Sequence, residues 1–228
     1  MSISRVMLAA AFGLSLFTGA NAAQAETTYE VTITNITRGQ TFTPQLIVTH
    51  RRTVSLFTAG EPASGGLELL AEGGDTSGVV GELAEAGARQ SASDTVPGLL
   101  GPGQSVTHTI AAGRNQPLFS MAAMLIPTND TFVALNGVRL PRTSATFTAI
   151  AYDSGTEAND QNCRNIPGPR CGGEGFSPGP NEGDEGFVYV SNGFHDLGTG
   201  TRRGGEVLGP LVYDWRNPVA QVTITRVD

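Results

Sequence analysis

Acidic residues lie at the outer ends of two neighbouring apolar segments, where they could together bind a cation. The segments are Phe132–Val138 and Ala145–Ala151, and a polar link around Pro141 joins them. If they pair as an antiparallel hairpin centred on that link, Asp130 lies directly opposite Asp153. Directly opposed residues have Cβ atoms about 5 Å apart, and like charges at that distance repel each other. The pattern therefore indicates a cation site, and we expect Ca²⁺.

The loop after Asp153 supplies more oxygen atoms of the kind that calcium prefers. It reads SGTEAND and contains Glu157 and Asp160. Calcium takes about 6–8 oxygen ligands from carboxylates, amides, carbonyls and water, whereas magnesium prefers few protein ligands and keeps its waters. Asp130, Asp153 and Glu157 are the candidate ligands, and Asn129 and Asp160 could complete the shell. The alternative is that Asp130 caps a turn and that the acids of the loop are solvated.

Catalytic motifs are missing from the rest of the sequence. His50, His108 and His195 fit neither an H-x-x-x-H nor an H-E-x-x-H spacing, and there is no G-x-S-x-G motif. We expect His108, in an alternating segment, to be buried and hydrogen-bonded. His195 precedes an aspartate, but adjacent residues on an extended chain point apart. A pair of acids could cleave a glycoside, but a polar, solvated loop lacks the apolar pocket that raises a catalytic pKa. We therefore predict a protein without enzyme activity, and keep a metal-dependent hydrolase as the alternative.

The first 25 residues predict a secretory signal peptide. Arg5 precedes the apolar run Val6–Phe17, which is too short to span a membrane, and small residues follow it. We expect cleavage after Ala22 or Ala25; an uncleaved N-terminal anchor is the alternative. Beyond residue 25 no apolar run is long enough to cross a bilayer. These features predict a secreted or periplasmic protein without a membrane span once the signal is removed.

Charge and cysteine content narrow the possible partners and covalent links. Fourteen basic residues, all of them arginine, and 21 acidic residues give a net charge of −7. An acidic chain argues against nucleic acid and anionic membrane surfaces as partners. Cys163 and Cys171 are the only cysteines and have no histidine nearby, which makes them a poor zinc pair. In an exported protein we expect them to form one local disulfide.

Apolar residues at alternating positions predict an all-β fold around the acidic stretch. Besides the two segments above, strands are expected at Thr28–Ile36, Phe42–His50, Ser105–Ala111, Leu118–Ile126, Gly186–Asn192 and Val219–Val227. We expect the first two of these to pair, with Pro44 placing the second at an edge or a bulge. The nearly continuous apolar run Leu118–Ile126 predicts a central strand that is buried on both faces.

The remaining segments predict a helical insertion and long loops. Ser55–Ala88 reads as two short helices, with Asp75-Thr76-Ser77 as the N-cap of the second. Asn159–Gly186 is a long loop rich in Gly and Pro. Trp215 could form a recognition patch with its neighbours, but we expect it to fill one end of the fold while Arg216 pairs with an acid. Residues 26–228 thus predict one antiparallel β-sandwich with a short helical insertion.

Several segments, in this order, resemble the spondin N-terminal domain family, above all its secreted bacterial members. They are FTPQLIVTH, LFTAGEPASGGLELLAEGGDTSGVVGEL, SMAAMLIPTNDTFVALNGVRLP, AYDSGTEAND and YDWRNPVAQVTI, of which PTNDTFVALNG and YDSGTE are the most specific. The resemblance implies a C2-like β-sandwich that binds calcium with carboxylates at one end. Asp130, Asp153 and Glu157 match the acidic positions of the family, whereas Thr131 stands where animal members carry tryptophan.

The residues and the resemblance together predict a secreted calcium-binding module. Because animal members belong to extracellular-matrix and adhesion proteins, the resemblance implies an extracellular protein or glycan as the partner. We expect the protein to be a monomer with a binding, adhesion or structural role. A structural envelope protein without a bound ion is a further alternative.

Overall fold

The computed structural model of the chain describes residues 26–87, 90–177, 182–198, 200–202 and 205–228. The predicted signal peptide, residues 1–25, lies outside the described residues.

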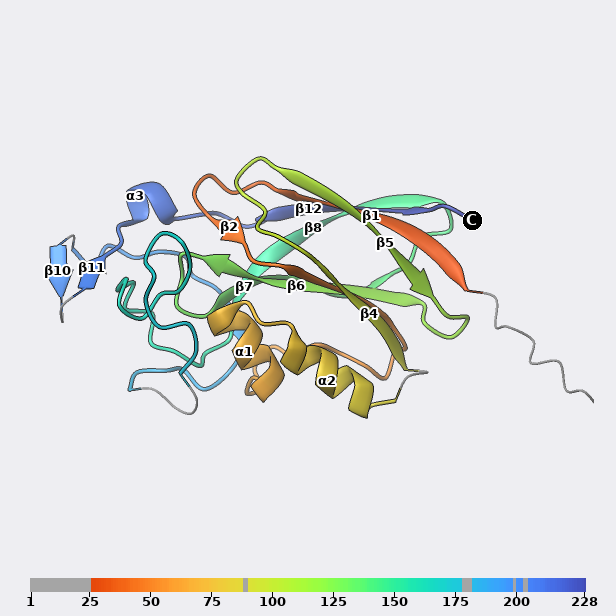
Figure 1. Cartoon of the computed structure of the whole chain (residues 1–228), viewed down its shortest axis with the longest axis horizontal. Helices are drawn as coiled ribbons and strands as arrows, with labels where there is room; N and C mark the ends of the chain where they lie inside the picture. Colours follow the sequence, from red (N-terminus) through yellow and green to blue (C-terminus); the bar gives the residue numbers. More distant parts are fainter. Residues whose placement is uncertain (1–25, 88–89, 178–181, 199, 203–204) are drawn as a thin grey trace, which may run out of the picture.

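Eight strands form one antiparallel sheet that curls until its two end strands approach each other (Figure 1). Their order across the sheet is β4-β3-β6-β7-β8-β12-β1-β5. In chain order these strands are β1 (Thr27–Asn35), β3 (Gln45–His50), β4 (Ser91–Val96), β5 (Ser105–Ala112), β6 (Leu118–Ile126), β7 (Thr131–Arg139), β8 (Ser144–Asp153) and β12 (Ala220–Arg226). Hydrogen bonds from Thr49 Oγ1 to Ala111 O and between His108 Nε2 and Asp94 Oδ2, both 2.7 Å, link the two ends of the sheet. The predicted all-β antiparallel fold is therefore confirmed.

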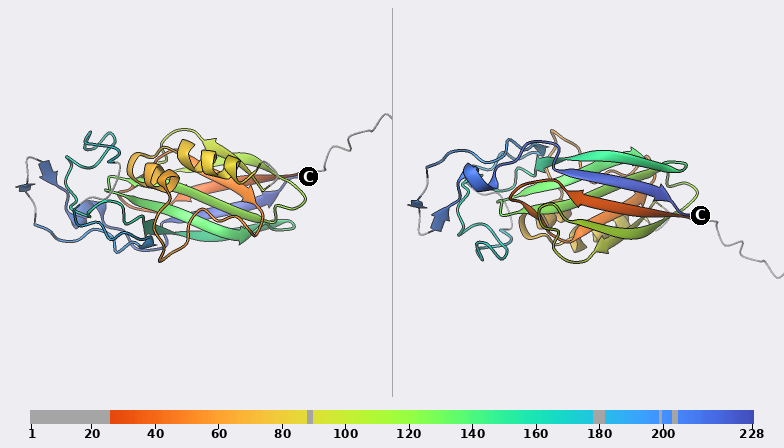
Figure 2. Two further views of the ribbon diagram at one scale, coloured as in Figure 1. Left: turned by 90° about the horizontal axis from the view of Figure 1, so that it is seen from below. Right: turned by 90° about the horizontal axis from the view of Figure 1, so that it is seen from above.

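Four shorter strands accompany this sheet. The two-residue strands β2 (Thr41–Phe42) and β9 (Tyr189–Val190) pair with β6 and β8. Strands β10 (Gly200–Arg202) and β11 (Gly205–Val207) form a separate two-stranded sheet. They lie beyond one end of the main sheet, beside the short helix α3 (Pro210–Tyr213) and the long loops, whereas the C-terminus lies at the opposite end (Figures 1 and 2).

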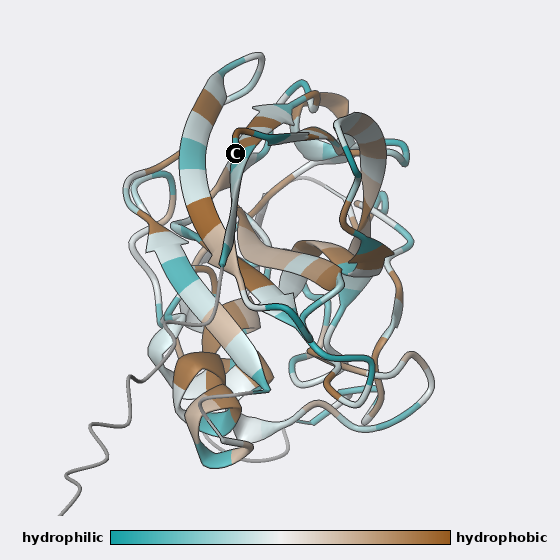
Figure 3. Ribbon diagram, turned by 90° about the vertical axis from the view of Figure 1, so that its right-hand side faces the viewer, coloured by the Kyte–Doolittle hydropathy of each residue, from teal (hydrophilic) through white to brown (hydrophobic). Residues whose placement is uncertain are grey.

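The main hydrophobic core fills the space that the curled sheet encloses. Alternate residues of β1, β5 and β12 point inward, and the polar residues between them face outward, so these strands are banded in Figure 3. Val31, Ile33, Val222 and Ile224 are at most 1% exposed. Burial of such a side chain stabilises the fold by about 1.5–3 kcal/mol. Strands with one apolar face therefore form the part of the sheet whose outer face contacts water.

Helices α1 (Gly65–Gly73) and α2 (Ser77–Glu85) cover the outer face of the other strands (Figure 2). Leu67 and Leu70 of α1 pack against Leu46 of β3 and Phe132 of β7. Because β3 and β6 are covered on both faces, every residue of β6 after Leu118 is buried. The predictions of two short helices and of a fully buried central strand are both confirmed.

One pairing and one edge position predicted from the sequence are wrong. Strand β1 pairs with β12 and β5, not with β3, which lies between β4 and β6. A strand with one apolar face and a strand with two belong to different parts of this sheet, because only the second needs the helices above it. Pro44 interrupts the second segment between β2 and β3, but it does not place β3 at an edge.

Caps and a disulfide fix the insertion and the long loop. Ser64 Oγ accepts a hydrogen bond from Leu67 N at the start of α1, and the Glu82 carboxylate accepts bonds from Gly66 N and Ser64 Oγ. For α2 the N-cap is Thr76, whose side chain makes no capping bond, so only its position in the predicted N-cap segment is confirmed. Cys163 and Cys171 form the predicted disulfide.

Candidate metal centre

Asp130 and Asp153 lie side by side where β7 begins and β8 ends. Thr131, not Asp130, is the partner of Asp153 in the register, and Ser154 N donates a hydrogen bond to Asp130 O. The predicted pairing was thus wrong by one residue. Strand β7 pairs with β8 only from Thr131 to Ala134. The earlier part of β8 pairs with β12 instead. The link around residue 141 therefore does not set the register between β7 and β8.

Asp130 is fully buried with one oxygen bonded and the other without a partner. Its Oδ2 accepts hydrogen bonds from Thr156 N (2.8 Å), Glu157 N (3.1 Å) and Ser154 Oγ (3.0 Å). Its Oδ1 has no hydrogen-bond partner in the described part of the chain. Burial raises the pKa of Asp130, although these amide hydrogen bonds oppose the rise. A buried acceptor without a partner costs about 1–3 kcal/mol, and more if it is charged.

Asp153 is 1% exposed and lies close enough to Asp130 to be affected by its charge. Its Oδ1 accepts a hydrogen bond from Gly155 N, and its Oδ2 accepts one from Asn159 Nδ2, both at 3.0 Å. Burial and then the charge of Asp130 raise the pKa of Asp153 to about 8. The nearby Tyr189 hydroxyl also has a raised pKa, because of burial and the charge of Asp153.

Glu157, the third of the predicted carboxylates, is 6% exposed. Burial and then the charges of Glu72 and Asp130 raise its pKa to about 9. The expectation that acids of this loop lie in polar, solvated surroundings is therefore wrong, because the loop folds back over the end of the sheet. A protein that buries several carboxylates must neutralise them by protonation or by a cation.

Glu72, near the C-terminal end of α1, is a fourth buried carboxylate that the sequence did not reveal. It is 1% exposed, its Oε2 accepts a hydrogen bond from Ser177 N (2.9 Å), and its Oε1 has no partner among the described residues. Burial raises its pKa to about 7. One local signal could have found it: an acid in the last turn of a helix faces the negative end of the helix dipole.

Asn129 and Asp160, the two additional candidates, are joined to each other. Asn129 Nδ2 donates to Asp160 Oδ1 at 3.1 Å, and Asn129 Oδ1 accepts from Gln161 N at 3.2 Å. The remaining Asp160 oxygen accepts from Asn165 Nδ2 at 2.7 Å. Both side chains thus hold the loop in shape, and both line a cavity of about 240 Å³ that Glu157 also faces. Of the three candidate carboxylates, only Glu157 lines this cavity.

The sequence was compared with models of known protein families. A family model described as Spondin_N matches residues 26–160, which are 135 of the 228 residues of the chain. The chain belongs to the Spondin_N family. No curated protein matches it. The match ends before β12, although β12 lies between β8 and β1 in the spondin sheet, so the fold of this spondin domain extends beyond the matched residues.

The family and the disulfide together indicate an extracellular type of domain. Spondin domains are not known as enzymes. Among the described residues of this spondin chain, no helix is both long and apolar enough to cross a membrane.

The donor atoms of the spondin site fit a hard cation. The side chains around Asp130 offer only oxygen atoms, which suits Ca²⁺ and not zinc or copper. In the described residues no three His, Cys, Asp or Glu side chains are grouped so that they could hold a metal ion, so the structure does not bring Asp130, Asp153 and Glu157 together as a complete set of ligands. Carboxylates without a cation repel each other, and calcium commonly takes backbone carbonyls and water as further ligands. The partnerless Oδ1 of the buried Asp130 is the observation that fits an ion here.

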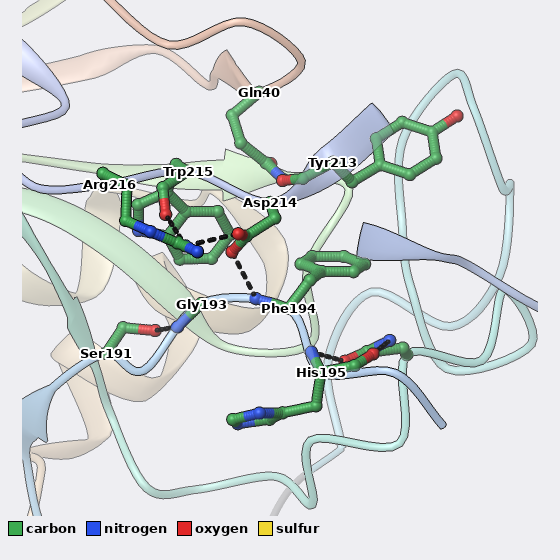
Figure 4. A network of polar contacts seen from close by, with 10 residues as sticks. Gln40, Ser191, Gly193, Phe194, His195, Tyr213, Asp214, Trp215 and Arg216 are labelled. Atoms are coloured by element: carbon green, nitrogen blue, oxygen red, sulfur yellow. Dashed lines mark hydrogen bonds and ion pairs between the residues drawn. The ribbon is translucent and has the colours of Figure 1, made fainter. Parts of the chain in front are cut away.

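The rings of His50 and His108 are hydrogen-bonded within the fold. His50 is buried between Arg51 O and Ser120 Oγ, and burial lowers its pKa. His108 is hydrogen-bonded as expected, but its side chain is 31% exposed and not buried. The side chain of His195 makes none of the drawn contacts; its backbone N–H is the group bonded in Figure 4.

Trp215 is 7% exposed and packs against Phe194 at one end of the core. Arg216 contacts the carboxylate of Asp214, which also accepts a bond from Phe194 N at 3.2 Å (Figure 4). Trp215 and Arg216 thus take the places expected from the sequence.

Proposed function

We propose that this spondin domain is a secreted calcium-binding module, with Asp130, Asp153 and Glu157 as the carboxylates that hold one Ca²⁺. The partnerless, fully buried Oδ1 of Asp130 carries the proposal. It lies beside a second buried carboxylate, Asp153, whose pKa is raised by burial and then by the charge of Asp130. A divalent cation at this position would turn a repulsion between buried like charges into an attraction.

Calcium accounts for this arrangement better than protonation alone. A protonated carboxyl group needs an acceptor for its proton, and Asp130 Oδ1 has none in the described residues. Calcium also tolerates irregular shells of carboxylate, carbonyl and water oxygens, which a strand end and two loops can supply. The ion would then fasten the start of β7, the end of β8 and the loop that follows β8.

One observation favours a hydrolase as the second candidate. Glu157 lines the cavity of about 240 Å³, and its pKa, raised to about 9, keeps it protonated at neutral pH, as a proton donor must be. Asp130 and Asp153, however, do not line that cavity. A catalytic pair would need both carboxylates to face the substrate, so a module that binds an extracellular protein or a glycan is the better proposal.

A calcium titration followed by thermal melting tests the proposal. Calcium at about 100 times its dissociation constant contributes about 2.7 kcal/mol, which raises Tm by about 5–10 °C in a domain of this size. We expect that rise in the wild-type protein, a much smaller one with Mg²⁺, and none in Asp153→Asn. Glu61→Gln, at an exposed acid outside the site, is the matched control and should keep the full rise. A wild-type Tm that calcium does not move would disprove the proposal.

A further inference from the structure

Glu72 is a buried carboxylate with one oxygen that has no partner within the described residues. Its side chain is 1% exposed, so solvent cannot solvate the charge. One oxygen accepts from Ser177 N, and the other has no partner among the described residues. Of the buried side-chain atoms that lack a partner in the described chain, two belong to carboxylates: Asp130 Oδ1 and Glu72 Oε1. The others are on Gln40, Arg51 and Gln90.

A single residue connects these two carboxylates. Thr156 donates its backbone N–H to Asp130 Oδ2 at 2.8 Å, and its side chain hydrogen-bonds to Glu72. The charge of Asp130 acts on Glu72, and the charge of Glu72 acts on Glu157. The end of α1 therefore lies against the same loop that carries Glu157.

The α1 end is also in close contact with the long loop. A side chain at Gly73 would meet Gly175 O at 2.8 Å, so the backbones of the helix and the loop nearly touch. Two residues further on, Ser177 N binds the Glu72 carboxylate. Glu72 therefore joins helix α1 to this part of the long loop.

We propose that Glu72 is a further ligand of the calcium ion, so that the ion ties helix α1 to the end of the sheet. This inference rests on the proposed function, because it concerns the same ion. The helical insertion would then take part in calcium binding. The bound ion would hold α1 against the end of the sheet, and removal of the ion would loosen the contact between α1 and the loops. A carboxylate that only accepted the bond from Ser177 N would need no charge, since a glutamine oxygen accepts the same bond.

The test compares Glu72→Gln with Glu85→Gln, a control at an exposed acid in the same helical insertion. Isothermal titration of the purified protein with CaCl₂ measures the dissociation constant. We expect Glu72→Gln to weaken binding by at least about tenfold, as loss of a group that supports a metal typically does, and Glu85→Gln to bind like the wild type. Glu72→Gln should also melt no lower than the wild type in chelator, because it keeps the acceptor and removes a buried charge.

A second readout separates a ligand from a residue that only supports the fold. Calcium should slow amide hydrogen exchange in α1 more than in α2 in the wild type, and this difference should vanish in Glu72→Gln. If the wild type binds calcium and Glu72→Gln binds it equally well, the inference is overturned while the proposed function stands. If the wild type binds no calcium, the proposed function fails first and the inference fails with it.

Discussion

Two buried polar clusters in this fold use opposite strategies. The Asn35 cluster consists of Asn35, Thr37 and the backbone carbonyls of residues 40 and 100. Asn35 Nδ2 donates to both carbonyls at 2.8 and 2.9 Å, and its Oδ1 accepts from Thr37 N and Thr37 Oγ1. The carboxylate cluster consists of Glu72, Asp130, Asp153 and Glu157. It is equally buried, but it consists of carboxyl groups and leaves two oxygens without partners in the described residues.

The Asn35 cluster consists of polar groups that stabilise the fold, whereas the carboxylate cluster consists of groups whose burial costs stability. A buried amide with all four bonds made contributes to stability and to a unique packing. Buried like charges lower stability unless something neutralises them. The carboxylate cluster therefore needs protonation or a counter-ion, and a condition or substitution that changes charge should affect the two clusters in opposite ways.

The pH dependence of calcium-free stability should show the largest effect. The pKa values of Glu72, Asp153 and Glu157 are raised to about 7, 8 and 9, above their values in an unfolded chain. The folded state therefore holds these protons more tightly, so stability is full at about pH 4 and falls as pH rises through about 9. Since each pKa unit is worth about 1.4 kcal/mol, we expect a loss of at least about 4 kcal/mol, measured by urea unfolding in chelator.

Saturating calcium provides the control for this pH series. A bound cation favours the ionised carboxylates, so the loss of stability at high pH should largely disappear in excess CaCl₂. A calcium-free protein that is as stable at pH 9 as at pH 5 would contradict the buried anionic cluster itself.

Disruption of the Asn35 cluster should have the next largest effect on stability, and this effect should not depend on calcium. Asn35→Ala removes four buried hydrogen bonds and leaves Thr37 N without a partner among the described residues, while Leu100 O keeps its bond from Phe42 N and Gln40 O keeps its bond from Thr37 Oγ1. We expect a loss of about 3 kcal/mol in urea unfolding, equal in calcium and in chelator. If calcium rescued this variant more than the wild type, the two clusters would be coupled and not separate.

Asp130→Asn should do the reverse and stabilise the calcium-free protein. The asparagine oxygen can still accept the bonds from Thr156 N and Glu157 N, while its NH₂ group replaces a charged oxygen that lacks a partner. We expect a gain of about 2 kcal/mol at pH 8 in chelator together with complete loss of the calcium-induced rise in Tm. A variant that is less stable than the wild type in chelator would show that the Asp130 charge supports the fold.

Much of the fold could be predicted from local sequence patterns. Alternation in residues 28–36 and 219–227 marked the strands with one apolar face, and the unbroken run of residues 118–126 marked a strand buried on both. Strand β4 was missed because its sequence, SASDTV, has little apolar content and lies at one end of the sheet path. Which strands pair was not predictable, because β1 and its partner β12 are almost 200 residues apart.

The candidate site divides in the same way. Asp130 and Asp153 were found because one pair of adjacent strands brings them together. Their burial was not foreseen, since the loop that covers them looks polar in sequence. Glu72 was missed because its neighbours, Thr156 and Ser177, lie more than 80 residues away along the chain. Local patterns thus locate acids at strand ends, while the degree of burial depends on contacts between distant segments.

The contact between β4 and β5 should show the smallest effect on stability. Asp94 Oδ2 and His108 Nε2 lie 2.7 Å apart, but their side chains are 54% and 31% exposed. Water solvates this carboxylate, and exposed pairs contribute about 0–1 kcal/mol. We expect Asp94→Asn to change the free energy of unfolding by less than about 1 kcal/mol, with the calcium-induced rise in Tm unchanged. A larger loss would mean that this pair, and not the two cores, keeps the ends of the sheet together. With a small loss, exposure is what separates a carboxylate that hardly affects stability from the buried ones, which must be protonated or paired with a cation.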